Sequence, residues 1–438
     1  MCALAEIMAG LGFAVQGSDR SDGLTMQHLR EIGIPVFIGH DPKTITKDLD
    51  AVIFSAAIQR ENPEIQAAME REIPVVRRAE LLGQIMAHHH ALAVSGTHGK
   101  TTTTGMLVQI FQAKGVDPSW IAGGSWVGGK PGNAGKSSFL IVEADEFDRA
   151  FLSFYPTSVI VTNIDSDHLD TYGTRENLEA AFVTFLERRP FFGTALVNAE
   201  DPGVKRVRDR IKGRVRTFGL ESGDYQARDV VMSLTGTQFS IYYRDENLGS
   251  IKLNVWGLHN VRNGLAASAL AYEEGLSFLS IQKGLASFTG MRRRMEKIGT
   301  QSGILVLDDY AHHPTEVEAV LLALRTLNPE GRLCIIFQPH LYSRTRQFCQ
   351  EFAQAFLHCD RLFVLPVYSA REKPEAGIEG DALVAAAIRL GHPSARYIPN
   401  REVVVAELLQ VLKPGDICVT MGAGDVGDLA KKIREAIP

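Results

Sequence analysis

Short apolar runs alternate with helical stretches along almost the whole chain. The runs Phe139-Leu140-Ile141-Val142 and Ser158-Val159-Ile160-Val161 have the length and β-branched content of buried strands. Between such runs, stretches such as Pro63 to Arg71 carry apolar residues at helical spacing. Further strands are expected at 13–15, 51–54, 74–76, 239–243, 304–307, 333–337, 362–365 and 417–420. This alternation is typical of an α/β fold with parallel sheets.

The chain is too long for a single ordinary core, at 438 residues and 48.0 kDa. We predict three domains: a Rossmann-like domain over residues 1–90, a P-loop ATPase-like domain over 91–297 and a second Rossmann-like domain over 298–438. Three histidines, 88–90, mark the first boundary. Because consecutive side chains point in different directions, we interpret them as a solvated connector and not as a metal site.

Composition narrows the class of protein. With 45% hydrophobic and 22% charged residues and a net charge of -5, the chain has no electrostatic footprint for nucleic acid. Its five cysteines are scattered without C-x-x-C spacing, which favours a reducing compartment. The apolar start is interrupted by Glu6, unlike a signal peptide, and no run is long enough to span a membrane. We therefore expect a cytoplasmic protein without membrane insertion.

The segment from Leu92 to Thr104 carries the most specific chemistry. An apolar strand runs into a turn with Gly96 and Gly99, and a helix is expected to start near Lys100. Such a turn points backbone N–H groups at phosphate oxygens, while the lysine reaches the β- and γ-phosphates and the hydroxyl of Thr101 binds Mg²⁺. The usual P-loop spacing requires glycine at position 94, where Val94 stands, so the loop is a shorter variant. A chance Gly-Lys-Thr turn is the alternative.

Acidic residues follow two later strands. Glu143 ends the strand 139–142 and is a natural Mg²⁺ partner in the crevice at the carboxyl edge of the sheet. Asp167 and His168 follow the strand 158–161, where they could hold a second metal ion or the acceptor. Each acid taken alone would more simply be a helix cap or a loop residue. Because two strand ends beside the phosphate loop both carry such residues, we favour a functional site over these simpler explanations.

A glycine motif near the C-terminus has a simpler explanation. Gly422 to Gly427 matches the dinucleotide fingerprint G-x-G-x-x-G, but only one helix, 428–435, follows it. The fingerprint also requires a second strand that carries an acidic residue, and too few residues follow the helix to form one. We predict a tight turn from strand to helix.

Six ordered motifs together resemble the Mur ligases, and the resemblance covers essentially the whole chain. They are Gly96-Thr97-His98-Gly99-Lys100-Thr101-Thr102-Thr103, Glu143-Ala144-Asp145-Glu146, Thr162 to Asp170, Gly257 to Asn263, Gly290 to Glu296 and Asp308 to Glu316. Six motifs in the same order are far more specific than any one of them. The first domain would then bind a nucleotide sugar, the second ATP and the third an amino acid.

The resemblance also implies roles for individual residues. Lys100 would bind the ATP phosphates within the loop formed by Gly96, Thr97, His98, Gly99, Thr101 and Thr102. Thr101 and Glu143 would hold one Mg²⁺, and His168 would help to hold a second. Asn260 and Asn263 would face the adenine, and Arg294 and Asp308 the ribose and phosphates. Tyr310, His312 and Arg344 would shape the amino-acid pocket; the implied catalytic residues are Lys100, Glu143, His168, His312 and Arg344.

The implied reaction joins L-alanine to the carboxylate of UDP-N-acetylmuramate in peptidoglycan precursor synthesis. That carboxylate would attack the γ-phosphate of ATP to give an acyl phosphate, and the alanine amine would then displace phosphate. ATP and Mg²⁺ are the implied cofactors, and we expect a monomer or a weak dimer.

The chain departs from the family pattern at three places. The family opens with a strand and a glycine-rich loop that receives the uridine diphosphate, and this chain starts where that loop would end. We therefore expect an in-frame upstream segment that supplies both. Phe147 stands where many relatives have serine, and residues 177–187 contain no lysine for the carbamylation found in several other Mur ligases.

Alternative functions remain open. A murein tripeptide ligase acts on the same nucleotide sugar, but Tyr310 and the stretch Gln338 to Arg344 favour the alanine-adding reaction. A folylpolyglutamate-type ligase would lack the first domain. A third alternative, from another class of protein, is a catalytically silent nucleotide-binding regulator. Such a protein would not need intact catalytic residues, so the presence of Lys100 and Thr101 argues against it.

Overall fold

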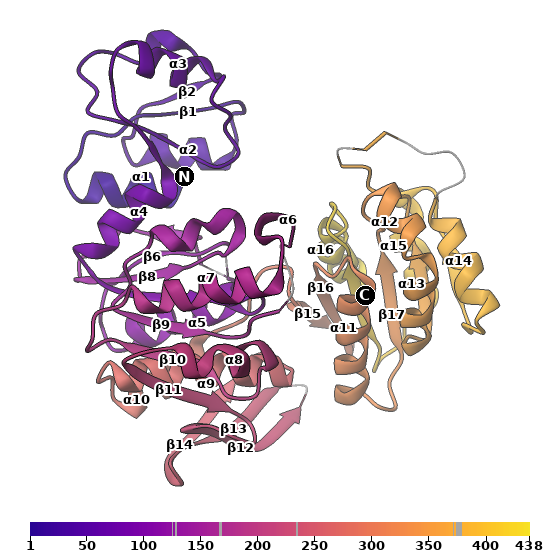
Figure 1. Ribbon diagram of the computed structural model, residues 1–438. Helices are drawn as coiled ribbons and strands as arrows, with labels where there is room; N and C mark the ends of the chain where they lie inside the picture. The colour runs from indigo at the N-terminus through magenta and orange to yellow at the C-terminus, as the bar shows by residue number, and fades with distance from the viewer. Residues whose placement is uncertain (125, 128, 166–168, 234, 371, 374–378) are drawn as a thin grey trace. The chain divides into compact units, whose positions relative to one another are not determined.

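The computed structural model describes the chain except for residues 125, 128, 166–168, 234, 371 and 374–378. It forms two compact units, and each is described by itself (Figure 1). The first unit comprises Met1–Val231, Thr237–Asn254 and Leu258–Thr289, and the second comprises Met232–Gly236, Val255–Gly257 and Gly290–Pro438. The mixed α/β structure agrees with the expected fold class.

The N-terminal region of the first unit contains two separate pairs of parallel strands, β1-β2 and β3-β4. Its elements are α1 (Cys2–Gly10), β1 (Gly17–Asp19), α2 (Leu24–Glu31), β2 (Val36–Ile38), a 3-10 turn (Pro42–Thr44), β3 (Val52–Phe54), α3 (Pro63–Glu70), β4 (Val75–Arg77) and α4 (Arg78–Ala87). The predicted strand at 13–15 is wrong: Phe13 is exposed, and the strand forms later at the polar Gly17–Asp19. Pairing with β2, and not local apolar content, decides where this strand forms.

A ten-stranded sheet forms the body of the first unit, in the order β14-β13-β12-β11-β10-β9-β5-β8-β6-β7 (Figure 1). Its strands are β5 (His90–Ser95), β6 (Ser119–Ile121), β7 (Gly132–Asn133), β8 (Phe139–Glu143), β9 (Ser158–Val161), β10 (Thr194–Asn198), β11 (Arg214–Gly219), β12 (Tyr225–Ser233), β13 (Gly236–Tyr243) and β14 (Glu246–Leu253). Its helices are α5 (Lys100–Ala113), α6 (Leu169–Tyr172), α7 (Arg175–Glu187), α8 (Pro202–Val207), α9 (Leu258–Glu273) and α10 (Phe278–Ser287), with 3-10 turns at Phe147–Ser153 and Arg208–Arg210. Parallel pairing sets β5 between β8 and β9, so the ends of these three strands meet at one edge.

Alternate residues of the central strands enter one core. Ala91 and Ala93 of β5 pack with Val159 and Val161 of β9 and with Phe182 of α7, all fully buried. The intervening strand residues point to the opposite face, as the period of two requires. The predicted connector holds for residues 88 and 89, but His90 is the first residue of β5, and its Nε2 lies 2.6 Å from Glu274 Oε2.

The second unit contains a six-stranded sheet in the order β15-β16-β20-β17-β18-β19. Its elements are β15 (Glu296–Gln301), β16 (Ile304–Asp309), α11 (Pro314–Leu327), β17 (Leu333–Phe337), α12 (Tyr342–Gln347), α13 (Cys349–Ala355), a 3-10 turn (Phe356–His358), β18 (Arg361–Val364), α14 (Gly380–Arg389), β19 (Ala395–Tyr397), a 3-10 turn (Arg401–Val403), α15 (Val404–Leu409), β20 (Ile417–Met421) and α16 (Gly427–Ala436). Helices α11, α13 and α14 pack on one core and α15 and α16 on the other. Trp256, 4% exposed, belongs to the first of these cores although it lies far earlier in the chain.

The glycine motif at 422–427 forms the predicted turn from strand to helix. It connects β20 to α16, and Gly422 has φ +143° close to the carbonyl of Gln338. In the part of the chain that the structure describes, no helix is long and apolar enough to cross a membrane.

Candidate active site

The turn between β5 and α5 has the shape of a phosphate-binding loop. Gly96 has φ +129° and Gly99 has φ +84°, both in the left-handed region that favours glycine. A Cβ on Gly99 would lie 2.6 Å from Asn263 Oδ1, and one on Gly96 would collide with Thr162. Gly99 is also the N-cap of α5, so the free N–H groups at the start of this helix face the loop.

The segment after β9 fixes the shape of this loop. The hydroxyl of Thr162 donates to the carbonyl of His98 at 2.6 Å, and the His98 N–H donates to Asn163 Oδ1 at 2.8 Å. The N–H of Asp165 donates to the hydroxyl of Thr97 at 2.9 Å. Thr97 and His98 therefore hold the loop in shape through hydrogen bonds to the segment that follows β9. Sequence reasoning did not assign this role to Thr162 and Asn163.

Lys100 lies against a buried carboxylate. Its Nζ is 2.9 Å from Oε2 and 3.1 Å from Oε1 of Glu146, and 3.6 Å from Asp145 Oδ1. Glu146 is 1% exposed; burial raises its pKa, and Lys100 opposes that rise. Lys100 is therefore largely enclosed, with its side chain 12% exposed. The motif contained Glu146, but sequence reasoning gave it no role.

The predicted magnesium ligands Thr101 and Glu143 lie together. The Thr101 hydroxyl donates to Glu143 Oε1 at 3.0 Å, and the N–H of Gly123 donates to Oε2 at 2.5 Å. Burial raises the pKa of Glu143, while these hydrogen bonds lower it. A hydroxyl and a carboxylate are the oxygen donors that Mg²⁺ prefers, so the pair fits this ion. His168, the predicted second ligand, lies outside the described residues.

The remaining nucleotide residues of the first unit lie beside the loop. Asn263 on α9 packs against Gly99 and is 7% exposed. Its Nδ2 lies 3.4 Å from Asn260 Oδ1, one helical turn earlier. Thr102 is 9% exposed on α5, so its side chain belongs mainly to the packing of the helix.

Arg294 and Asp308 lie in the second unit, in different surroundings. Arg294 is exposed, whereas Asp308 is 3% exposed and accepts a hydrogen bond from Thr420 at 2.6 Å. The cation that faces Asp308 is Arg293, with Nε at 3.4 Å. Burial raises the pKa of Asp308. Sequence reasoning missed Arg293, which is adjacent to the chosen residue.

The next residue, Asp309, fastens two segments of backbone. Its carboxylate accepts the N–H of Ala311 at 2.7 Å and that of Met295 at 2.6 Å. Burial raises its pKa to about 6. Asp309 thus sets the paths of the chain into and out of the β15-β16 pair.

The three predicted amino-acid residues gather at the carboxyl edge of the second sheet. The His312 ring packs edge-on against Tyr310 at 5.2 Å and against His340 at 5.9 Å between ring centres. His340 Nδ1 lies 3.3 Å from a guanidinium nitrogen of Arg344. Burial lowers the pKa of His312, so the ring is neutral at pH 7. The sequence did not single out His340, which links His312 to Arg344.

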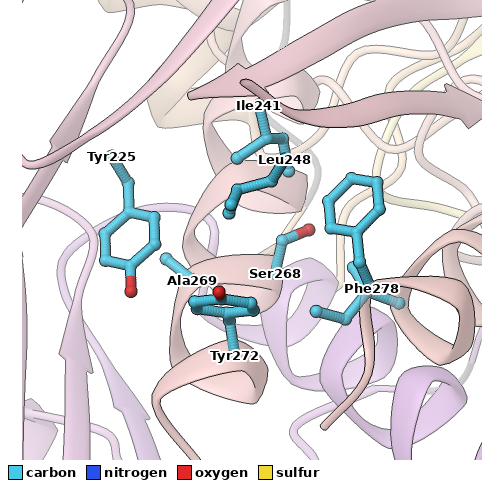
Figure 2. Close-up of a pocket in the computed structure, with 8 residues that line it drawn as sticks. Tyr225, Ile241, Leu248, Ser268, Ala269, Tyr272 and Phe278 are labelled. Atoms are coloured by element: carbon cyan, nitrogen blue, oxygen red, sulfur yellow. The ribbon is translucent and has the colours of Figure 1, made fainter. Parts of the chain in front are cut away.

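Two hollows are lined by residues other than the predicted site residues. Figure 2 shows a hollow enclosed by Tyr225, Ile241, Tyr272 and Phe278, which is too small for a water molecule and contains none of the predicted site residues. In the second unit a cleft of about 630 Å³ is lined by His313 and Phe348 among others.

Three family models cover most of the chain: "Mur ligase family, catalytic domain" over residues 1–90, "Mur ligase middle domain" over 94–271 and "Mur ligase, glutamate ligase domain" over 293–424. The UDP-N-acetylmuramate–L-alanine ligase of Psychrobacter cryohalolentis is 43% identical over 437 residues, which is 98% of this chain and 91% of the relative. The ligase of the same name from Nitratidesulfovibrio vulgaris is 39% identical over 99% of this chain and 95% of its own.

Among solved structures, the UDP-N-acetylmuramate–alanine ligase of Thermotoga maritima has a TM-score of 0.81 at 27% identity, covering 99% of this chain and 96% of that one. A murein peptide ligase from Psychrobacter arcticus has a TM-score of 0.63 at 24% identity, over 99% and 96% of the two chains, and shows the fold alone. These matches agree with the phosphate loop and the acids beside it. The chain belongs to the Mur ligase family of ATP-dependent ligases.

Proposed function

We propose that this chain joins L-alanine to the carboxylate of UDP-N-acetylmuramate at the expense of ATP, in peptidoglycan precursor synthesis. The observation that carries the proposal is the glycine loop with Lys100 and Thr101 facing Glu146 and Glu143. The names of relatives at 39–43% identity supply the substrates. We further propose that the enzyme acts in the cytoplasm as a monomer or weak dimer, with domains at 1–90, 91–297 and 298–438.

Most residues of the proposed ATP site belong to the first unit. The backbone N–H groups of the loop and the start of α5 bind phosphate oxygens, and Lys100 neutralises their charge. Thr101 and Glu143 would hold Mg²⁺, which screens the phosphates when bound. Asn260 and Asn263 are proposed to face the adenine, and Arg294 and Asp308 the ribose and phosphates. We retain His168 as a proposed ligand of a second metal ion.

The chemistry then follows from the charges. A carboxylate oxygen of the sugar attacks the γ-phosphorus, the bond to the bridging oxygen breaks, and ADP leaves with an acyl phosphate remaining. The amine of L-alanine attacks the acyl carbon, phosphate departs, and the nitrogen loses a proton. The first step brings an anionic carboxylate to an anionic phosphate chain, so Lys100 contributes by stabilising charge on the transferred phosphoryl group.

Tyr310, His312 and Arg344 are proposed to hold the amino acid. The guanidinium of Arg344 suits the carboxylate of L-alanine, because its forked donors match that group. The neutral His312 ring, packed on Tyr310, adds a partner without adding positive charge beside the attacking amine. Support for this pocket is the series of contacts that runs from Tyr310 through His312 and His340 to Arg344.

The test measures ADP release with purified full-length chain. We expect release to require UDP-N-acetylmuramate and an amino acid together, with L-alanine the best substrate among the common ones. Mass spectrometry of the nucleotide-sugar product identifies the added residue. Consumption of the tripeptide L-Ala-γ-D-Glu-meso-diaminopimelate in place of free alanine would show the alternative ligase activity and overturn the proposal.

A further inference from the structure

Cys2, Glu6 and His28 converge in the N-terminal region, and none of them was given a role in the site described above. Cys2 and Glu6 lie one turn apart on α1, and His28 lies on α2. Their ligand atoms all lie within 4.8 Å of one another. We propose that these three side chains bind a transition-metal ion, with Zn²⁺ the best match.

The distances are close to those of a metal site. Cys2 Sγ lies 3.3 Å and His28 Nε2 lies 3.1 Å from the same oxygen, Oε1 of Glu6. In a tetrahedral zinc site with bonds of about 2.0–2.3 Å, neighbouring ligand atoms are separated by roughly 3.3–3.7 Å. Two of the three separations are therefore within a few tenths of an ångström of those in such a site, and the third, between Cys2 Sγ and His28 Nε2, is at most 4.8 Å. The side chains are partly exposed, which leaves room for water as a fourth ligand.

The chemistry of the donors selects the kind of ion. Thiolate and imidazole favour zinc and similar transition metals, whereas Mg²⁺ takes oxygen ligands. The site is thus chemically distinct from the Thr101–Glu143 pair. Without metal, the Cys2 thiol donates a hydrogen bond to Glu6 Oε1. Binding breaks the S–H bond, releases the proton to solvent and forms a sulfur–metal bond.

The other cysteines cannot provide this site. Cys334, Cys359 and Cys418 are buried within the second unit, and burial raises the pKa of each. Cys349, in the same unit, is partly buried like Cys2 and so offers a matched control. Among the described residues, Cys2, Glu6 and His28 form the single group of three or more potential metal ligands of this kind.

Occupancy would join α1 to α2 through metal bonds instead of hydrogen bonds. Leu4 and Ile7 of α1 are buried in the large core of the first unit, whereas α2 lies in the chain between the paired strands β1 and β2. A metal ion that binds only the folded form stabilises it by mass action. We therefore expect zinc to raise the temperature at which this region unfolds.

The experiment uses the full chain without an affinity tag. Protein is incubated with ZnCl₂ and excess MgCl₂, passed through a desalting column, and its zinc is measured by atomic absorption. We expect one zinc per chain for the wild type and for Cys349→Ala, and at least about tenfold weaker binding for Cys2→Ala and His28→Ala. Titration with Co²⁺ adds a thiolate-to-metal absorption band that Cys2→Ala abolishes and Cys349→Ala retains.

Circular dichroism checks that each variant is folded, and Cys2→Ser gives a second, smaller change at the same position. A wild type that retains no zinc after desalting overturns the proposal and leaves the three residues as a hydrogen-bonded cluster. Equal zinc retention by Cys2→Ala and the wild type overturns it as well. Neither result affects the ligase assay, because that assay supplies only Mg²⁺.

Discussion

The ammonium of Lys100 lies 2.9 Å from Oε2 of Glu146, a carboxylate almost completely removed from solvent. A phosphate chain that binds the loop must therefore share this lysine with Glu146 or take it away. The lysine is at once a phosphate ligand and the counter-charge of a buried acid. Its replacement has consequences for both activity and folding.

Lys100→Ala should abolish turnover and also lower the melting temperature. Removing the ammonium leaves Glu146 buried without its partner, which costs about 1–3 kcal/mol before protonation of the acid relieves it. The double variant Lys100→Met with Glu146→Gln should recover most of the melting temperature and remain inactive. Differential scanning fluorimetry and ADP release measure the two effects. A single variant as stable as the wild type would show that the pair contributes nothing to folding.

Thr101→Val should raise the Mg²⁺ concentration needed for half-maximal activity by about tenfold, since it removes an oxygen ligand but keeps the shape of the side chain. Thr101→Ser retains the hydroxyl and serves as the control. Titration of ADP release with MgCl₂ at saturating ATP gives the comparison. An unchanged magnesium requirement for the valine variant would remove Thr101 from the proposed metal site.

Asp309 should make stability depend on pH. Its pKa is raised from 3.8 to about 6 in the folded chain, so the folded state binds more protons than the unfolded state between these values. Stability therefore falls as pH rises from about 4 to about 6, by up to about 3 kcal/mol at 1.36 kcal/mol per pKa unit. Asp309→Asn removes this dependence. Between pH 4.5 and 7, the melting temperature of the wild type should fall relative to that of the variant as pH rises. A difference between the two melting temperatures that stays constant with pH would contradict the assignment.

His312→Ala should raise the KM for L-alanine by about tenfold with little change in the KM for ATP, because the ring belongs to the cluster around Tyr310 and Arg344. His358→Ala, at a partly exposed position of the same unit, is the control. Initial rates at varied alanine concentration give both constants. Equal effects on both KM values would place His312 outside the amino-acid pocket.

The parts of the fold that follow from short-range pattern were predictable. The apolar run Val159-Ile160-Val161 is a fully buried strand, and the glycines and Lys100 mark the start of α5 as expected. The strand predicted at Phe13 to Val15 is absent because so short a strand forms only where it has a partner. The polar segment Gly17–Asp19 has such a partner in β2. Local propensity cannot report such pairing.

The site residues, too, were predictable where local pattern decides their position and not where the folded path decides it. Glu143 was predictable because it ends a strand whose register beside β5 brings it to the phosphate loop. Glu146 lies in the loop beyond that strand, and only the folded path shows that it turns inward to Lys100. Arg293 and Arg294 are adjacent in sequence, and the left-handed backbone at Arg293, φ +57°, belongs to the turn that directs its side chain to Asp308. Sequence spacing alone gives no basis for choosing between them.

Trp256 gives the second unit a spectroscopic label of its own. The chain has three tryptophans, and Trp120 and Trp126 both lie in the first unit, with ring centres 5.6 Å apart. Changing these two to phenylalanine would leave indole emission from the core of the second unit alone. The same placement bears on dissection of the chain: a fragment cut at residue 298 loses this side chain and leaves a hole in the hydrophobic cluster that it fills.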